Sequence, residues 1–159
     1  MRILTGILAF LALGAFAHAA EPVVAASPAQ QRAMLESDDP QLAANKRLVW
    51  NMWREFLQAG HIDAADKYLA PEYHQHNPNA ETGLEGVKAY FRAVGREPEE
   101  VKDHIDRLVA MTAERDLVTL ALVRPMKDKD GNDYTTTWFD MFRIRDGKIV
   151  EHWDTATMP

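Results

Sequence analysis

The chain has 159 residues, a formal net charge of −6 and no cysteine. This length predicts one domain that is large enough to bury a core. The absence of cysteine excludes disulfides, thiolate nucleophiles and thiolate metal sites. No basic stripe or polybasic patch is visible, which disfavours nucleic acids and anionic membrane surfaces as partners.

The first residues have the three-part layout of a secretory signal peptide. Arg2 precedes an uncharged run from residue 3 to residue 16, and Ala17-His18-Ala19 places small residues where a signal peptidase cleaves. The apolar run is too short to cross a bilayer comfortably. We therefore expect residues 1–19 to be removed, leaving a periplasmic or secreted protein without stable membrane insertion. A retained anchor is the alternative.

The next segment, residues 20–38, is rich in Ala, Pro, Gln and Ser, which predicts a linker or a lead-in helix. Residues 39–159 then form the predicted domain. It opens with Asp39-Pro40, a helix N-cap followed by proline at the first helical position, and the helix continues to Gln58. Further helices are predicted over residues 62–69 and 86–94, with a mostly loop segment over 73–83.

The second half of the domain reads as strands. Turn signals at residues 114–116, Asp130-Gly131 and Asp146-Gly147 separate the runs with strand character. These strands are predicted over residues 101–112, 117–123, 134–145 and 148–155. Helices first and an antiparallel sheet of about four strands afterwards indicate an α+β fold with helices on one sheet face.

A two-residue turn at Asp146-Gly147 predicts the register of the last hairpin. Asp140 should then lie opposite Trp153, and Phe142 opposite Glu151. One face would carry Trp138, Asp140, Phe142, Ile144, Ile149, Glu151 and Trp153. The other would carry Phe139, Met141, Arg143, Val150, His152 and Asp154. Because both faces are partly apolar, one could face the helices and the other a partner subunit.

Asp140 is the candidate catalytic acid/base on this strand. The predicted register surrounds its carboxylate with Trp138, Phe142 and Trp153, which we interpret as walls of a binding site. Removal from water would raise the pKa of Asp140 toward the range useful for proton transfer. The alternative is a carboxylate near an open rim, hydrogen-bonded and chemically inert.

The segment Tyr73-His74-Gln75-His76-Asn77-Pro78 gathers polar rings and amides that can orient a carbonyl or hydroxyl ligand. Tyr73, Gln75 and Asn77 are therefore candidate substrate-binding residues. His76 could shuttle a proton near neutral pH, as a second catalytic residue. The alternative is a structured loop in which Asn77 bonds the backbone and His76 caps a neighbour. No histidine or carboxylate spacing typical of a metal site is present, so no metal is predicted.

Several features that follow one another along the chain together resemble a known family. They are a Trp-rich first helix, Tyr-x-Gln-His-Asn-Pro at 73–78, Gly83 and Gly86 before a helix, and the run from Phe139 to Asp154. It is similar to SnoaL-like proteins of the NTF2-like superfamily, described as polyketide cyclases or predicted aldol-condensation enzymes. The resemblance covers about residues 42–155. One departure is the turn at residues 114–116, where an expected glycine is missing.

The resemblance implies an NTF2-like cone, in which a curved antiparallel sheet and N-terminal helices enclose a pocket, and a homodimer formed through the sheet. It also implies an aspartate acid/base without metal or cofactor, and the match falls on Asp140. Gln75, His76 and Asn77 would lie at the pocket mouth.

Three functions follow as expectations from these residues and this resemblance. The first is a cofactor-independent isomerase, lyase or cyclase that enolises a carbonyl compound. The second is a periplasmic binding protein in which Trp138 and Trp153 stack on a small apolar ligand. The third is a dimerisation module whose pocket has no role.

Overall fold

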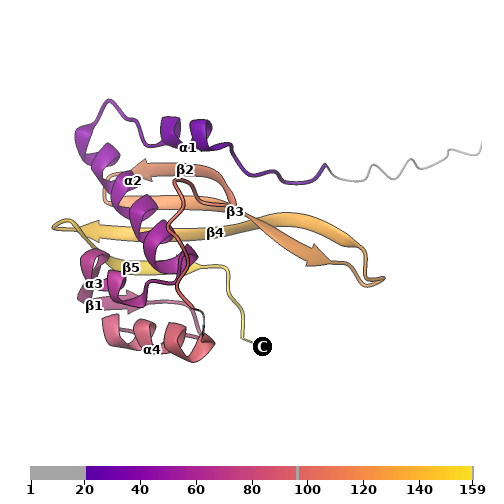
Figure 1. The fold of residues 1–159 in the computed structure, drawn as a ribbon. Helices are drawn as coiled ribbons and strands as arrows, with labels where there is room; N and C mark the ends of the chain where they lie inside the picture. Colours follow the sequence, from indigo (N-terminus) through magenta and orange to yellow (C-terminus); the bar gives the residue numbers. More distant parts are fainter. Residues whose placement is uncertain (1–20, 96, 159) are drawn as a thin grey trace, which may run out of the picture.

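The computed structural model of this chain describes residues 21–95 and 97–158. The predicted signal peptide, residues 1–19, lies outside the described residues. Within the described part, no helix is long and apolar enough to cross a lipid bilayer. Figure 1 shows the helical first half of the chain lying on a sheet built mainly from the second half.

The sheet has five strands in the order β1-β5-β4-β3-β2 (Figure 1). The strands are β1 (Leu69–Gln75), β2 (Leu108–Glu114), β3 (Leu117–Lys127), β4 (Asp133–Arg145) and β5 (Lys148–Asp154). All neighbours are antiparallel except β1 and β5, which pair in parallel. The prediction of an antiparallel sheet of about four strands missed β1, which forms where a helix end and a loop were expected and pairs in parallel. β1 is an edge strand, the position in a sheet where a proline such as Pro71 is tolerated.

The helix predicted to open the domain is α2 (Pro40–Met52), and Asp39 caps it by accepting a hydrogen bond of 2.7 Å from the Gln41 amide. Residues Trp53–Gln58 continue it as a π-helical segment, η1, rather than as the regular helix that was predicted. The amide of Ala59 donates to the Arg54 carbonyl, five residues back, at 3.0 Å. Phe56 of this segment is buried in the core, and Trp53 and Leu57 pack against the same cluster.

The core lies between α2, η1 and the inner face of the sheet. Val49, Met52 and Phe56 are at most 2% exposed, and they share one buried cluster with Leu120 and Phe142 of the sheet. The remaining helices are α1 (Pro28–Met34), η2 (Ile62–Ala64), α3 (Ala65–Tyr68) and α4 (Leu84–Val94). The helices α3 and α4 lie beside β1 at the lower edge of the sheet in Figure 1.

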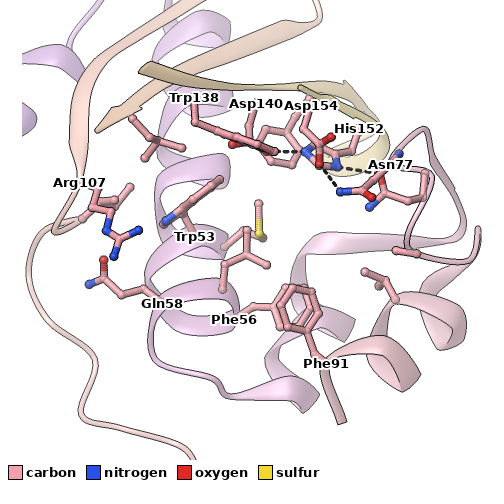
Figure 2. Close-up of a pocket in the computed structure, with 18 of the residues that line it drawn as sticks. Trp53, Phe56, Gln58, Asn77, Phe91, Arg107, Trp138, Asp140, His152 and Asp154 are labelled. Carbon is pink, nitrogen blue, oxygen red and sulfur yellow. Dashed lines mark hydrogen bonds and ion pairs between the residues drawn. The ribbon is translucent and has the colours of Figure 1, made fainter. Parts of the chain in front are cut away.

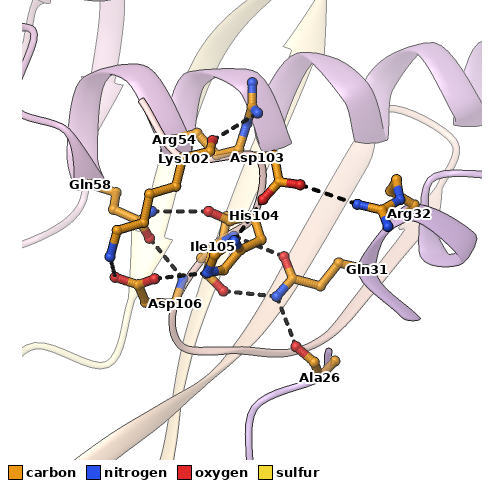
Figure 3. A network of polar contacts seen from close by, with 10 residues as sticks. All are labelled: Ala26, Gln31, Arg32, Arg54, Gln58, Lys102, Asp103, His104, Ile105 and Asp106. Atoms are coloured by element: carbon orange, nitrogen blue, oxygen red, sulfur yellow. Dashed lines mark hydrogen bonds and ion pairs between the residues drawn. The ribbon is translucent and has the colours of Figure 1, made fainter. Parts of the chain in front are cut away.

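Residues 101–107 form a loop, although a strand was predicted to begin at Val101. Two glutamine amides supply the hydrogen bonds that a neighbouring strand would have provided (Figure 3). Gln31 of α1 donates to the Ile105 carbonyl and accepts from its amide, both at 2.8 Å. Gln58 donates to the His104 carbonyl at 3.0 Å and accepts from the Asp106 amide at 2.8 Å. The lead-in segment is thereby joined to the rest of the fold.

The last hairpin contains a β-bulge that the register prediction missed. Ile144 pairs with Ile149 as expected, but the next pairs are Arg143 with Glu151 and Phe142 with His152. One extra residue on β5, Val150, therefore separates the regular parts of the ladder. Every later side chain of β5 changes face as a result. His152 and Asp154 share the inner face with Asp140, while Glu151 and Trp153 lie on the outer face, which corrects the predicted arrangement.

Candidate functional site

A cavity of about 650 Å³ opens between the helices and the inner face of the sheet (Figure 2). Its middle is apolar, with Met52, Trp53, Phe56 and Phe91 from the helices facing Leu122 of β3. Six of the eight predicted site residues line it, namely Tyr73, Gln75, Asn77, Trp138, Asp140 and Phe142. This volume suits a small organic molecule.

Asp140 is the central polar residue of this cavity. It is 4% exposed, and its Oδ1 lies 2.7 Å from Nε2 of His152 on the neighbouring strand. Its second oxygen, Oδ2, is buried without a hydrogen-bond partner among the described residues. A buried, unpaired carboxylate oxygen is costly unless a ligand or a proton engages it.

His152 is held by a second polar contact on its other ring nitrogen. Nδ1 lies 2.8 Å from Oε1 of Gln75, and the same oxygen accepts the Asn77 amide at 2.9 Å. The ring of His152 also stacks on Phe142, with centroids 4.6 Å apart. These contacts fix the orientation of the imidazole.

The hydrogen bonds also fix where protons can sit. Since Oε1 of Gln75 is an acceptor, Nδ1 of His152 must carry a proton. The close approach of Nε2 to Asp140 then requires one further proton between them, either on Nε2 or on the carboxyl group. Without it, two lone pairs would face each other at 2.7 Å. The pair therefore holds one shared proton in a buried site.

Burial raises the pKa of Asp140, and this effect outweighs the lowering effect of the bond to His152. The negative charge of Asp154 adds to the rise. The indole of Trp138 lowers the pKa of Asp140 as well, and this is the smallest of these effects. Asp140 is thus buried and has a raised pKa, and its neighbours on β5 are His152 and Asp154 rather than Trp153.

Two further polar groups lie near this pair. Burial, together with the charges of Asp140 and Asp154, raises the pKa of Tyr73, which keeps its hydroxyl group protonated. The Tyr73 hydroxyl accepts a long contact of 3.5 Å from Gln75, and its own proton has no acceptor among the described residues. Asn77 donates to Oδ2 of Asp154 at 2.6 Å, which leaves the second amide proton of Asn77 for another acceptor.

The other two predicted site residues, His76 and Trp153, lie on the outer face of the sheet and do not line this cavity. Nε2 of His76 is 2.9 Å from Glu151, and its ring stacks on Trp153 at 5.0 Å. Their predicted roles in catalysis and substrate binding stay predictions, but the cavity that they were expected to share is on the opposite side.

His152 and Asp154 are the two cavity residues on β5, and sequence reasoning did not assign them to the site. The run Glu151-His152-Trp153-Asp154 was recognised, but alternation counted without a bulge placed the wrong pair inward. One ligand atom each from Asp140, His152 and Asp154 lies within 4.8 Å of the others, so this set could hold a metal ion. Oδ1 of Asp140 and both Asp154 oxygens already have protein partners, which a metal would have to replace.

Comparison with known proteins identifies the architecture. Residues 50–152 match the sequence profile of the family described as SnoaL-like domain. No curated protein sequence matches the chain. A predicted polyketide cyclase from Acidithiobacillus ferrooxidans is 20% identical with a TM-score of 0.53, covering 75% of this chain and 89% of that one.

Two further solved structures have similar scores. A predicted SnoaL-like polyketide cyclase from Jannaschia sp. CCS1 is 15% identical with a TM-score of 0.53, covering 76% of this chain and 91% of that chain. An LEH-like epoxide hydrolase from M. tuberculosis is 19% identical with a TM-score of 0.52, covering 72% and 84%. The NTF2-like α+β fold is thereby confirmed, with a sheet that is mixed and not closed.

Proposed function

We propose that this chain, which belongs to the family of SnoaL-like domains, is a cofactor-independent acid/base enzyme acting on a small carbonyl compound. One observation carries the proposal. The cavity holds a buried aspartate whose Oδ1 is fixed by His152 while Oδ2 has no partner among the described residues. An oxygen that is buried, unpaired and next to a proton-holding imidazole is well suited to accept a proton from a ligand.

In the proposed step, Oδ2 of Asp140 removes a proton from the carbon next to the carbonyl group. The electrons of that C–H bond move into an enolate, whose oxygen accepts hydrogen bonds from the Tyr73 hydroxyl and the Asn77 amide. The proton then sits on Asp140, and His152 keeps the carboxyl group in place through Oδ1. Return of the proton to a different position gives isomerisation, and attack of the enolate on a second carbonyl gives an aldol-type cyclisation.

The cavity walls favour this chemistry in two ways. Asp140 is 4% exposed between Trp138 and Phe142 on the inner face of β4, and the low access of water strengthens each electrostatic contact there. The same apolar walls favour a ligand with an apolar body. Gln75 acts as a positioning residue, because its amide contacts His152 and the Asn77 backbone.

Deuterium incorporation tests the proposal directly. The purified protein would be incubated in D₂O with a panel of aryl methyl ketones, and loss of the methyl signal followed by proton NMR. We expect Asp140→Asn to lower the exchange rate by roughly 10²–10⁴-fold. Asp130→Asn makes the same chemical change at the exposed β3–β4 turn and should keep the rate.

The same experiment can also show that the cavity binds ketones without reacting with them. If ketones raise the melting temperature but no variant or wild-type protein incorporates deuterium, the cavity binds ligands without chemistry. That result would replace the enzymatic proposal with the ligand-binding function.

Export is also proposed, on the signal-peptide layout of residues 1–19. Mass spectrometry of protein recovered from the periplasmic fraction of the producing cells should give a chain that begins at Ala20 or Glu21. Recovery of the intact chain from the cytoplasm alone would contradict export.

A homodimer through the outer face of the sheet is the third proposal, supported by an exposed phenylalanine with apolar neighbours there. Phe139 is 48% exposed and lies beside Ala121 and Met141 on the central strands. Apolar side chains grouped on a sheet face favour a protein partner.

A further inference from the structure

The end of the cavity remote from His152 carries two arginines. Arg107 directly precedes β2, Arg124 lies on β3, and both line the cavity. The Val123 amide donates to the Arg107 carbonyl at 2.8 Å, which brings the two segments together. Figure 2 shows Arg107 and Gln58 on one side of the cavity, with His152 and Asn77 on the other.

Neither guanidinium group has a carboxylate partner among the described residues. Arg124 lies over the ring of Trp138, 4.4 Å from the ring centroid, and makes a cation–π contact there. The carboxylate of Asp106 at this end is engaged with other groups. Asp106 lies 2.7 Å from the Lys102 ammonium and 3.1 Å from His104, and Asp106 and, to a smaller extent, Glu99 raise the pKa of Lys102.

The opposite end of the cavity is acidic. Asp140 and Asp154 lie there, and the pKa of Asp140 is raised in part by the charge of Asp154. A ligand anion would be repelled from this end and attracted to the arginines. The cavity is thus polarised along its length, in a protein whose net charge of −6 would otherwise disfavour anions.

We propose that the substrate carries a carboxylate group that binds at Arg107 and Arg124, joined through an apolar body to the reacting carbonyl. The planar guanidinium group matches a carboxylate through two parallel hydrogen bonds, which also sets the direction of the ligand. The inference rests on the proposed function for the position of the carbonyl at Asp140. The anion site itself needs only the arginine end of the cavity.

Matched keto acids and their methyl esters test this site. The probes are 4-acetylbenzoate and the longer 4′-acetylbiphenyl-4-carboxylate, each beside its neutral ester. Tryptophan fluorescence gives the affinities, because Trp53 and Trp138 line the cavity. We expect at least one acid to bind on the order of tenfold more tightly than its ester, as a charge-assisted contact predicts. This preference should fall as sodium chloride is raised, since Arg107 is exposed.

Variants separate this inference from the proposed function. Arg107→Gln should remove most of the preference for the acid and leave ester binding unchanged. Arg145→Gln removes the same charge at the exposed end of β4 and should keep the preference. Asp140→Asn should lose deuterium exchange and keep the preference.

Three results would overturn the inference. They are equal affinity for acid and ester, no binding of any of the four probes, and a preference that survives Arg107→Gln. A wild-type protein that prefers the acids but exchanges no proton would support the anion site and count against the enzymatic proposal alone.

Discussion

Replacing Asp140 by asparagine should stabilise the protein at neutral pH while removing its proposed activity. The amide has nearly the same shape as the carboxyl group, so the cavity wall is kept. With Nδ1 of His152 protonated by its contact to Gln75, Nε2 can accept a hydrogen bond from the new amide. The shared proton is lost, but the contact between the two strands remains.

The magnitude follows from two opposing terms. Exchange of a charge-assisted hydrogen bond for a neutral one costs about 1 kcal/mol. Removal of a buried charge relieves a desolvation penalty of several kcal/mol, of which the contacts to His152 had offset only part. We therefore expect a net gain on the order of 1–2 kcal/mol. For a domain of this size, that is about 3–6 °C in melting temperature.

The pH dependence has a definite sign. Burial raises the pKa of Asp140 in the folded protein, so the folded state holds this proton more tightly than the unfolded state does. Wild-type stability from this group is greatest below the unfolded pKa of about 3.9 and falls as the pH rises through the folded value. The asparagine variant does not titrate there, so its advantage should open as the pH increases.

Thermal unfolding of both proteins at pH 4, 6 and 8 measures this difference, because the two proteins differ only at residue 140. The expected result is a small difference at pH 4 and a higher melting temperature for Asp140→Asn at pH 8. An equal or lower melting temperature at pH 8 would refute the claim that the buried carboxylate is destabilising.

Three further predictions concern other parts of the molecule. His152→Gln should lower ketone exchange by roughly 10²-fold, whereas His76→Gln on the outer face should change it less than threefold; similar losses in both would contradict the inward placement of His152. Arg115 has a φ of 54° in the turn where a glycine was expected. Because glycine adopts this conformation without strain, Arg115→Gly should raise the free energy of unfolding in urea by on the order of 0.5 kcal/mol, and Arg115→Ala should not. Phe139→Lys should convert a dimer to monomers by light scattering, and Val94→Lys, at 53% exposure on α4, should leave it intact; dimers in both would exclude this face.

Local signals in the sequence predicted most of the elements correctly. Asp39-Pro40 begins α2, Gly95 ends α4 at a φ of 71°, and Asp146-Gly147 forms the last hairpin turn with both residues at positive φ. Each of these depends on a few adjacent residues, so the chemistry that decides them is visible along the chain.

The errors arose where a distant segment decides the local structure. Residues 101–107 alternate in part like a strand, but the amides of Gln31 and Gln58 bind their backbone as a loop. The strand β1 contains Pro71 and polar residues, and it is extended because β5 pairs with it in parallel. No window of neighbouring residues contains these partners, so periodicity could not predict them.

The bulge at Val150 shows why the site was harder to predict than the fold. Either register gives a hairpin with the same turn and similar apolar content on both faces, so the fold class does not depend on it. The identity of the ring beside Asp140 does depend on the register. One extra residue brings the imidazole of His152, rather than the indole of Trp153, next to Asp140. With Trp153 opposite, the ring beside Asp140 could donate one N–H hydrogen bond but could not take up a proton near neutral pH. With the bulge, Asp154 lies opposite and Nε2 of His152 comes within 2.7 Å of Asp140. Asp140 then shares a proton with a ring that Gln75 orients, and acid/base chemistry becomes possible.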